Sequence, residues 1–375
     1  MNILITGGAG FIGANLVTRL HREGYAVCVL DNLSPQIHGS TPQDSPLRRQ
    51  IEGKCDFILG DVTDPVIVRA ALKGCDAVVH LAAETGTGQS MYEVARYCHS
   101  NVQGTAVLLE AIAERKDRIR KVVVASSRAV YGEGRYSLDG EFVYPKSRLE
   151  SDLSQGIFEP RCATTGRALK VEATDEDSRI LPNSIYGVTK YTQEQMTLLN
   201  CKALGIGAVA LRFQNVYGPG QSLSNPYTGI LSIFSTRIRH ERSIDVYEDG
   251  KESRDFVFID DVVEALVLGL NRPETAGEAF NIGTGVATSV MTVAQTLAER
   301  YGIVVPIQVT GSYRVGDIRH NYADTTKSAQ RLGFNARVGF EEGIGRFAQW
   351  VLKQPIHADS YGESLESLKK RGLFK

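Results

Sequence analysis

The stretch Thr6-Gly-Gly-Ala-Gly-Phe-Ile-Gly13 follows directly on the apolar run Asn2–Ile5. Its glycines Gly7, Gly10 and Gly13 have the spacing G-x-x-G-x-x-G, a variant of the fingerprint that binds dinucleotides. The first glycines let the chain turn tightly and approach a pyrophosphate, and the last lets a helix pack closely on its strand. The N-terminus of that helix offers N–H donors to the anion. The stretch therefore predicts a strand, a phosphate-binding turn and a helix.

An acidic residue ends the next predicted strand, Val27–Leu30. Asp31 follows Gly13 by 18 residues, the place where a carboxylate accepts hydrogen bonds from the hydroxyls of an adenosine ribose. The same carboxylate repels a 2′-phosphate, and no arginine follows it in Asp31-Asn-Leu33. We therefore expect the cofactor to be NAD rather than NADP.

Two later strand ends complete the expected cofactor site. Asp61-Val62 follows the third predicted strand and would lie beside the adenine, whereas Leu81-Ala-Ala83 follows the fourth and would border the phosphates and ribose. Taken singly, plain packing at a strand end explains either segment equally well. The expected cofactor-binding residues are Gly7, Gly10, Phe11, Ile12, Gly13, Asp31, Asn32, Asp61, Val62, Leu81, Ala82, Ala83, Tyr186 and Lys190.

The hydrophobic pattern predicts an α/β fold with a doubly wound parallel sheet of the Rossmann type. Short runs that are apolar throughout alternate with amphipathic segments, so both sheet faces should be covered. We expect a first domain over residues 1–216 and a smaller α/β substrate-binding lobe over 217–375, which can be interleaved with it. The expected strands are Asn2–Ile5, Val27–Leu30, Phe57–Leu59, Ala77–His80, Lys121–Ser126 and Ala208–Arg212, and the first-half helices are Phe11–Glu23, Pro65–Lys73, Glu93–Glu114 and Tyr186–Leu204.

The composition excludes several classes of protein. The chain has 375 residues, with 42 Lys and Arg against 43 Asp and Glu, and 42% of its residues are hydrophobic. These values exclude a disordered chain and binding to nucleic acid by bulk charge. No apolar run approaches the ~20 residues that span a membrane. Six scattered cysteines without a C-x-x-C pair predict reduced thiols in a cytoplasmic protein, and no spacing predicts a metal site.

A second motif, Tyr186-Gly-Val-Thr-Lys190, predicts a catalytic base. At positions i and i+4 of a helix the two side chains share one face. A neighbouring ammonium and an oxidised nicotinamide would both lower the pKa of the phenol. Ser127, at the end of the fifth predicted strand, could hydrogen-bond the substrate oxygen that gives up its proton. A serine here could also simply cap the turn.

One segment interrupts the alternation. Gly132–Pro182 has few apolar periods and many turn-forming residues, so we expect a loop with one short helix near Ser147–Leu153. It lies between Ser127 and Tyr186. We therefore expect it to line or cover the substrate pocket.

Together these motifs resemble the extended short-chain dehydrogenase/reductase family, in particular its nucleotide-sugar epimerase and dehydratase branch. The resemblance covers residues 1 to about 350. It implies that Ser127, Tyr186 and Lys190 are catalytic, that Lys190 binds the nicotinamide ribose, and that a homodimer forms through Glu93–Glu114. Further matching segments are Asn101-Val-Gln-Gly-Thr105, Leu211–Pro219, Ser253–Asp261 and Asn281-Ile-Gly283, and the implied substrate-binding residues are Ser127, Arg128, Asn215, Arg254, Arg314 and Asp317.

The residues after Ser127 indicate the branch. The family's 4,6-dehydratases carry Asp-Glu there as a second acid–base pair, whereas this chain has Arg128-Ala129. The resemblance therefore favours a 4-epimerase: Tyr186 removes the proton of a sugar 4-hydroxyl, hydride passes to NAD⁺ and then returns to the other face of a transient 4-keto sugar. The substrate would be a nucleotide-diphosphate sugar.

The long insertion resembles a smaller group within the family, the dTDP-L-rhamnose 4-epimerases, and implies a 6-deoxy sugar as substrate. Asn321 stands where the UDP-galactose 4-epimerases vary a residue that gates the sugar pocket, and its size leaves N-acetylated hexoses possible. The alternatives are a UDP-glucose or UDP-GlcNAc type of 4-epimerase, or a nucleotide-sugar reductase or decarboxylase. A dinucleotide-binding protein without activity would be expected to lack the tyrosine or the lysine.

Overall fold

A parallel sheet of seven strands forms the centre of the protein, with strand order β14-β9-β5-β4-β1-β2-β3. The computed structural model describes residues 1–225, 227, 229–356, 359 and 361–375. The predicted fold class is confirmed, and each of the six predicted strands is present within two residues. The strands are β1 (Asn2–Thr6), β2 (Ala26–Asp31), β3 (Asp56–Leu59), β4 (Ala77–His80), β5 (Lys121–Ser127), β9 (Gly207–Phe213) and β14 (Glu278–Ile282).

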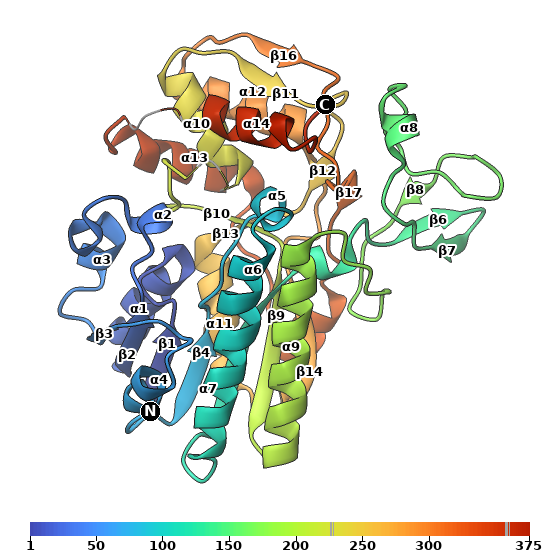
Figure 1. Ribbon diagram of the computed structural model, residues 1–375. Helices are drawn as coiled ribbons and strands as arrows, with labels where there is room; N and C mark the ends of the chain where they lie inside the picture. Colours follow the sequence, from blue (N-terminus) through green and yellow to red (C-terminus); the bar gives the residue numbers. More distant parts are fainter. Residues whose placement is uncertain (226, 228, 357–358, 360) are drawn as a thin grey trace.

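Helices cover both faces of this sheet, which explains why its strands are apolar throughout. In β1, Ile3 and Ile5 pack into the hydrophobic cluster on one face, and Leu4 packs into the cluster on the other. The helices α1 (Phe11–Arg22) and α11 (Ile259–Asn271) contribute to the first cluster, and α4 (Pro65–Ala71) and α7 (Gly104–Ala113) to the second. Helix α9 (Ile185–Leu204) lies beside α7, as Figure 1 shows.

The single helix predicted over Glu93–Glu114 is divided. It comprises α6 (Val94–Tyr97), a π-helical turn over Cys98–Gln103, and α7. The wider turn places Asn101 inside the protein, where its Oδ1 accepts the backbone N–H of Glu84 at 2.7 Å and its Nδ2 donates to Thr189 Oγ1 at 2.9 Å. Nothing in the hydrophobic period distinguishes this turn from α-helix.

A second layer lies at the carboxyl ends of the strands, at the top of Figure 1. The chain enters it after β10 (Asn215–Tyr217), returns to the sheet with α11 and β14, and enters it again with α12 (Val290–Tyr301). Where one domain ends and the other begins stays a prediction. The other elements of this layer are α10 (Ile230–Arg239), β11 (Ile244–Val246), β12 (Ser253–Arg254), β13 (Phe256–Phe258), β15 (Thr288–Ser289), β16 (Ile307–Val309), β17 (His320–Asn321), α13 (Phe340–Leu352) and α14 (Tyr361–Lys370).

Short helices complete the first half of the chain, namely α2 (Pro35–His38), α3 (Pro46–Gln50) and α5 (Thr87–Ser90). In the described parts of the chain, no helix combines the length and the apolar composition needed to span a bilayer. All six cysteines are free thiols.

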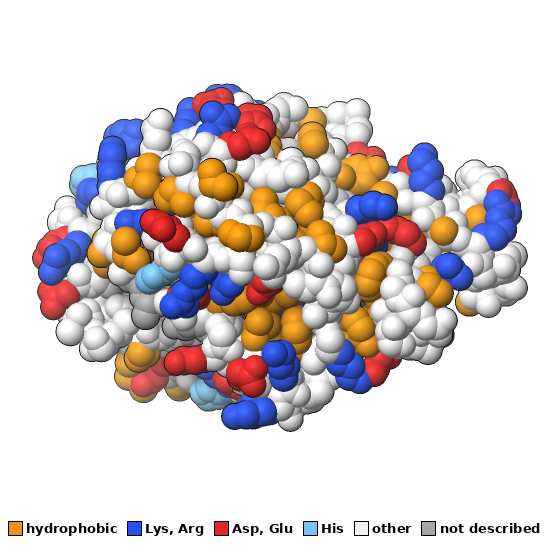
Figure 2. Space-filling view, turned by 90° about the horizontal axis from the view of Figure 1, so that it is seen from above, with side chains coloured by type: hydrophobic (Ala, Val, Ile, Leu, Met, Phe, Trp, Pro, Cys, Tyr) orange, Lys and Arg blue, Asp and Glu red, His pale blue; other side chains and the backbone are white. Residues whose placement is uncertain are grey.

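The insertion 132–182 forms an arm that projects at the right of Figures 1 and 2. The short helix expected near Ser147–Leu153 is present as α8 (Glu150–Leu153). The arm also contains an antiparallel sheet of three strands, β6 (Tyr136–Leu138), β7 (Glu141–Val143) and β8 (Lys170–Val171), in the order β7-β6-β8. These strands are only two or three residues long, too short for a period of two to reveal them.

A buried arginine joins this arm to the rest of the protein. Arg148 donates to the carbonyl oxygens of Phe158 at 3.1 Å and Asp317 at 3.0 Å, and its Nη2 lies 2.7 Å from Glu248 Oε1. Its Nε lies 3.3 Å from Glu133 Oε1. Burial raises the pKa of Glu133 to about 7, although the charge of Arg148 opposes this shift. The arginine therefore neutralises carboxylates that water cannot reach.

Replacing Arg148 with methionine should destabilise the protein, because the buried Glu133 would lose its cation and the buried Glu248 would keep only Arg319. The expected loss in the free energy of unfolding is about 3–5 kcal/mol, measured by urea denaturation. Arg167→Met is the matched control, since Arg167 pairs with Asp139 on the exposed surface of the same arm. A loss no larger than that of the control would contradict this role for Arg148.

Candidate active site

A cavity of about 600 Å³ lies between the carboxyl edge of the large sheet and the layer above it. Its lining brings together every site residue that the sequence predicted. These are Gly7, Gly10, Phe11, Ile12, Gly13, Asp31, Asn32, Asp61, Val62, Leu81, Ala82, Ala83, Ser127, Arg128, Tyr186, Lys190, Asn215, Arg254, Arg314 and Asp317.

The glycine turn between β1 and α1 has no room for side chains. A Cβ on Gly7 would lie 2.7 Å from the backbone nitrogen of Ala82, and Gly7 has a φ of +69°. A Cβ on Gly13 would lie 2.5 Å from the carbonyl oxygen of Gly7. Gly10 is the N-cap of α1 and provides no side chain to cap it, so the helix directs its first N–H groups at the cavity. The turn has the geometry of an anion-binding helix terminus.

Asp31 ends β2 at the wall of this turn. Its carboxylate accepts the backbone N–H groups of Ala9 at 2.9 Å and Leu33 at 2.8 Å. Burial raises its pKa in spite of these bonds, and His38 Nε2 lies 3.9 Å away. The pKa of His38 is lowered by its own burial. The backbone thus fixes the orientation of the carboxylate at the cavity.

Asp61 lies beside Asn32 at the same wall. Burial disfavours its charge, but hydrogen bonds from Thr63 and Asn32 outweigh this effect and lower its pKa. Asn32 Nδ2 donates to Asp61 Oδ2 at 2.8 Å. Asp61, which was expected beside an adenine, is therefore held in place by Asn32.

The first turn of α9 carries Tyr186 to the cavity. Ser184 caps the helix by accepting the N–H of Gly187 at 3.1 Å, and Ser90 of α5 accepts the N–H of Tyr186 at 3.0 Å. Burial raises the pKa of Tyr186, while a hydrogen bond with Ser127 and the charge of Arg128 oppose this shift. The sequence predicted the opposing charge to come from Lys190. In the structure it is Arg128 that favours the phenolate.

Lys190 lies one turn further on the same face of α9 and is almost fully buried. Its Nζ donates to Gln193 Oε1 at 2.7 Å, and burial lowers its pKa to about 7. Gln193 Nε2 donates in turn to Thr105 Oγ1 at 2.9 Å. The i and i+4 spacing therefore does place Tyr186 and Lys190 at one cavity, as predicted.

The polar chain continues through a buried histidine that sequence reasoning missed. His80 ends β4 and bonds Thr105 at 2.9 Å through Nε2 and Thr6 at 2.7 Å through Nδ1. Burial lowers its pKa to about 3, so the ring is neutral at physiological pH. The sequence predicted the strand Ala77–His80 but not the role of His80, because the hydrogen-bond partners of His80 lie on three other elements.

Three arginines of the cavity lining gather around Asp317. Arg128 Nε donates to Asn215 Oδ1 at 2.9 Å, and burial, aided by the charge of Arg254, lowers the pKa of Arg128 to about 10. Arg254 donates to Asp317 Oδ1 at 3.1 Å and to the carbonyl oxygen of Ile318 at 2.7 Å. Arg314 lies with its guanidinium carbon 5.0 Å from the ring centre of Tyr247. The positive charges of these arginines suit the binding of a group with several negative charges.

Two expectations about the sugar pocket are wrong. No residue of 132–182 is among the described residues that line the cavity, so the arm does not line the pocket, and that it covers the pocket stays a prediction. The reason is that its polar and apolar side chains pack instead on the segment that carries Asp317. Asn321 is fully buried and its Nδ2 faces Thr174 Oγ1 of the arm at 3.5 Å, so it does not gate the cavity.

The chain matches the NAD dependent epimerase/dehydratase family over residues 3–149 and 162–283. The chain is a member of this family. The residues 150–161, between the two matched ranges, belong to the arm described above. Because NAD is the family's cofactor and is present in related solved structures, NAD is also the cofactor of this epimerase-family chain. The glycine turn and Asp31 supply the anion-binding and ribose-binding chemistry that NAD needs.

Relatives cover nearly the whole chain. A dTDP-L-rhamnose 4-epimerase from Burkholderia thailandensis is 40% identical over 357 residues, which cover 94% of this chain and 95% of the relative. A solved UDP-glucose 4-epimerase from Thermotoga maritima, with UDP-glucose, is 29% identical at a TM-score of 0.76 and covers 94% of this chain and 99% of its own. MoeE5, solved with UDP-glucose and NAD, is 31% identical at a TM-score of 0.74 with the same coverage.

Replacing Asp31 with alanine should weaken NAD binding roughly tenfold, because a charged hydrogen-bond acceptor is lost. It should also reduce discrimination against NADP, because the charge that repels a 2′-phosphate is lost as well. Both affinities are measured by fluorescence titration of protein freed of its cofactor. Asp44→Ala, an exposed carboxylate nearby, is the control. Tighter binding of NADP than of NAD by the unchanged protein would contradict the assignment of Asp31.

Proposed function

We propose that this enzyme inverts the configuration at C4 of a nucleotide-diphosphate sugar, and that its substrate is dTDP-L-rhamnose, which it converts to dTDP-6-deoxy-L-talose. The observation that carries the proposal is the arrangement of the cavity. Ser127, Tyr186 and Lys190 line the same cavity as Arg128, Arg254 and Arg314, the arginines that suit a diphosphate. The choice of sugar is supported by the relative that is 40% identical over almost the full length of both chains.

Tyr186 and Ser127 divide the proton chemistry between them. Tyr186 accepts the proton of the sugar 4-hydroxyl, and the hydroxyl of Ser127 holds that oxygen in line with it. Arg128 stabilises the phenolate that this step requires. When bound, NAD supplies a reversible hydride acceptor, so that the sugar is oxidised and reduced again without net change. Tyr186 then returns the proton to the inverted hydroxyl.

Buried hydrogen bonds hold Lys190 in this site. Its ammonium is held by Gln193, which is fixed by Thr105 and, through it, by His80. Because these partners are buried and hydrogen-bonded, the amine keeps its position beside the cofactor ribose. The neutral ring of His80 adds no like charge that would displace the proton of Lys190.

The residues that follow Ser127 favour epimerisation over dehydration. Elimination of water needs an acid that protonates the leaving hydroxyl, and Arg128 cannot supply that proton at neutral pH. Its guanidinium is directed at Asn215, on the diphosphate side of the cavity. A UDP-glucose 4-epimerase is the second candidate, supported by the solved relatives that hold UDP-glucose.

Replacing Tyr186 with phenylalanine should lower kcat by at least about 10²-fold, because the group that accepts the proton is lost. Bound NAD, measured by its absorbance, should be unchanged. Ser127→Ala should be milder, about tenfold, since it removes one hydrogen bond and leaves the base in place. If Ser127→Ala loses as much activity as Tyr186→Phe, the two roles are assigned wrongly.

A panel of nucleotide sugars tests the proposed substrate. We expect dTDP-L-rhamnose to show inversion at C4 by NMR without added NAD, faster than UDP-glucose, UDP-galactose and UDP-GlcNAc. A requirement for stoichiometric NADH or NADPH would indicate a reductase, and release of carbon dioxide from a uronic acid would indicate a decarboxylase. Equal turnover of UDP-galactose and dTDP-L-rhamnose would contradict the choice of sugar but not of reaction.

We further propose a homodimer through the outer faces of α6, α7 and α9. Val94, Val188 and Leu199 are large apolar side chains exposed there, with 42%, 46% and 65% of their surface accessible. Light scattering should give twice the mass of one chain, and Leu199→Glu should shift the protein towards monomer. A monomeric unchanged protein would contradict this proposal. The cytoplasmic location expected from the cysteines stays a prediction.

A further inference from the structure

The C-terminal segment 361–375, which the sequence did not mark as functional, forms part of the cavity wall. Tyr361, Ser364 and Leu368 of α14 line the cavity, and each is less than a tenth exposed. Their spacing of i, i+3 and i+7 puts them on one face of the helix. Lys369 and Lys370 lie on the exposed face. One face of α14 is therefore buried at the cavity, and the opposite face is exposed to solvent.

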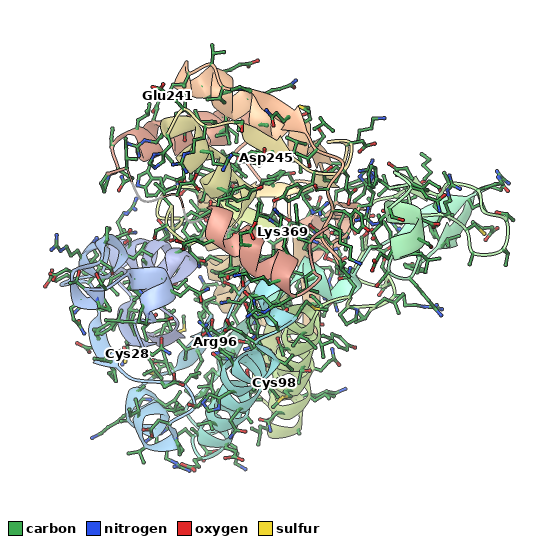
Figure 3. The ribbon with its side chains drawn as sticks, turned by 45° about the horizontal axis from the view of Figure 1, so that its top comes forward. Cys28, Arg96, Cys98, Glu241, Asp245 and Lys369 are labelled. Atoms are coloured by element: carbon green, nitrogen blue, oxygen red, sulfur yellow. The ribbon has the colours of Figure 1, made fainter. Side chains whose placement is uncertain are left out.

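The helix crosses the cavity from one layer to the other. At its start, the hydroxyl of Tyr361 hydrogen-bonds that of Tyr247, beside β11, and Arg237 lies over the Tyr361 ring at 4.7 Å. In Figure 3 the helix, marked by Lys369, lies between Asp245 of β11 and Arg96 of α6. At its end, the guanidinium of Arg371 lies 4.3 Å from the ring centre of Tyr92, which follows α5 in the sheet layer.

The last residues hold the backbone on either side of Arg314. The N–H of Tyr313 donates to the carbonyl of Lys375 at 2.8 Å, and the N–H of Val315 donates to that of Leu373 at 3.0 Å. Phe374 packs edge-on against Tyr247 at 5.1 Å, the ring that Arg314 covers from 5.0 Å. The tail therefore fixes both the backbone and the aromatic support of one of the cavity's arginines.

We propose that the segment 361–375 forms part of the nucleoside-diphosphate subsite. Helix α14 closes that subsite from the side opposite the sheet, and the tail positions Arg314 towards the diphosphate. Within the described parts of the chain, no hydrogen bond or ion pair joins this segment to the glycine turn, Asp31 or Asp61, so we expect the affinity for NAD to be independent of it. The inference rests on the proposed function in one respect, that the substrate carries a nucleoside diphosphate.

The double variant Arg371→Ala/Phe374→Ala removes two side-chain contacts of the segment, that of Arg371 with Tyr92 and that of Phe374 with Tyr247. Calorimetric titration of the holoenzyme with dTDP and UDP should show a Kd at least tenfold higher than that of the unchanged protein. The content of bound NAD should stay the same, a result that general unfolding would not give. Arg371→Ala alone, which changes an exposed residue, should also raise the Kd. Lys370→Ala, on the outer face of α14, is the matched control and should bind as the unchanged protein does.

Hydrogen exchange provides a second measurement. Saturating dTDP should slow amide exchange in 361–375 of the unchanged protein, and this protection should be lost in the double variant. An unchanged Kd in the double variant, or no protection of the segment, would overturn the inference. A protein that binds dTDP through this segment but inverts no sugar would contradict the proposed function alone. A protein that inverts sugars while its double variant keeps the same Kd and KM would contradict this inference alone.

Discussion

The contact between Gly13 and the carbonyl oxygen of Gly7 holds α1 against the end of β1, and the cavity depends on it. A Cβ on Gly13 would lie 2.5 Å from that oxygen, so any side chain would push the helix away from the sheet. The N-terminus of α1 would then move away from β2 and β4, whose ends carry Asp31 and Leu81. One steric limit thus sets the distance between the anion-binding turn and the strand ends around it.

A second constraint comes from the burial of the sheet on both faces. Polar side chains inside such a layered structure need partners, and here they find one another at the carboxyl edge. A chain of hydrogen bonds runs from β1 to α9 without an exposed member, through Thr6, His80, Thr105, Gln193 and Lys190. The position of a reactive amine on α9 is therefore tied to the register of β1 and β4. This connection makes the catalytic end rigid, as orientation of reacting groups requires.

Local sequence patterns predicted those features whose signal lies within a few neighbouring residues. The glycine spacing, Asp31 and the i, i+4 pair Tyr186 and Lys190 each lie within one turn or one strand end, and all reached the cavity. The features that were missed arise from contacts between distant segments. Gln193 connects Lys190 to Thr105 only because α9 packs on α7. Helix α14 has a polar sequence, and its buried face is defined by the cavity that it lines and by the contact of Tyr361 with Tyr247. The arm 132–182 was located correctly, but no periodicity in the sequence predicts its packing on Tyr313 and Asp317.

The pairing of Leu373–Lys375 with Tyr313–Val315 also has a consequence for the order in which the protein assembles during translation. The glycine turn, Asp31, Ser127 and Lys190 all lie within the first 190 residues and can come together while the rest of the chain is still being made. The β14 edge of the sheet is completed only when residues 278–282 have emerged, and the wall around Arg314 only after residue 375. A nascent chain therefore gains the means to hold its dinucleotide well before it can close around a second nucleotide.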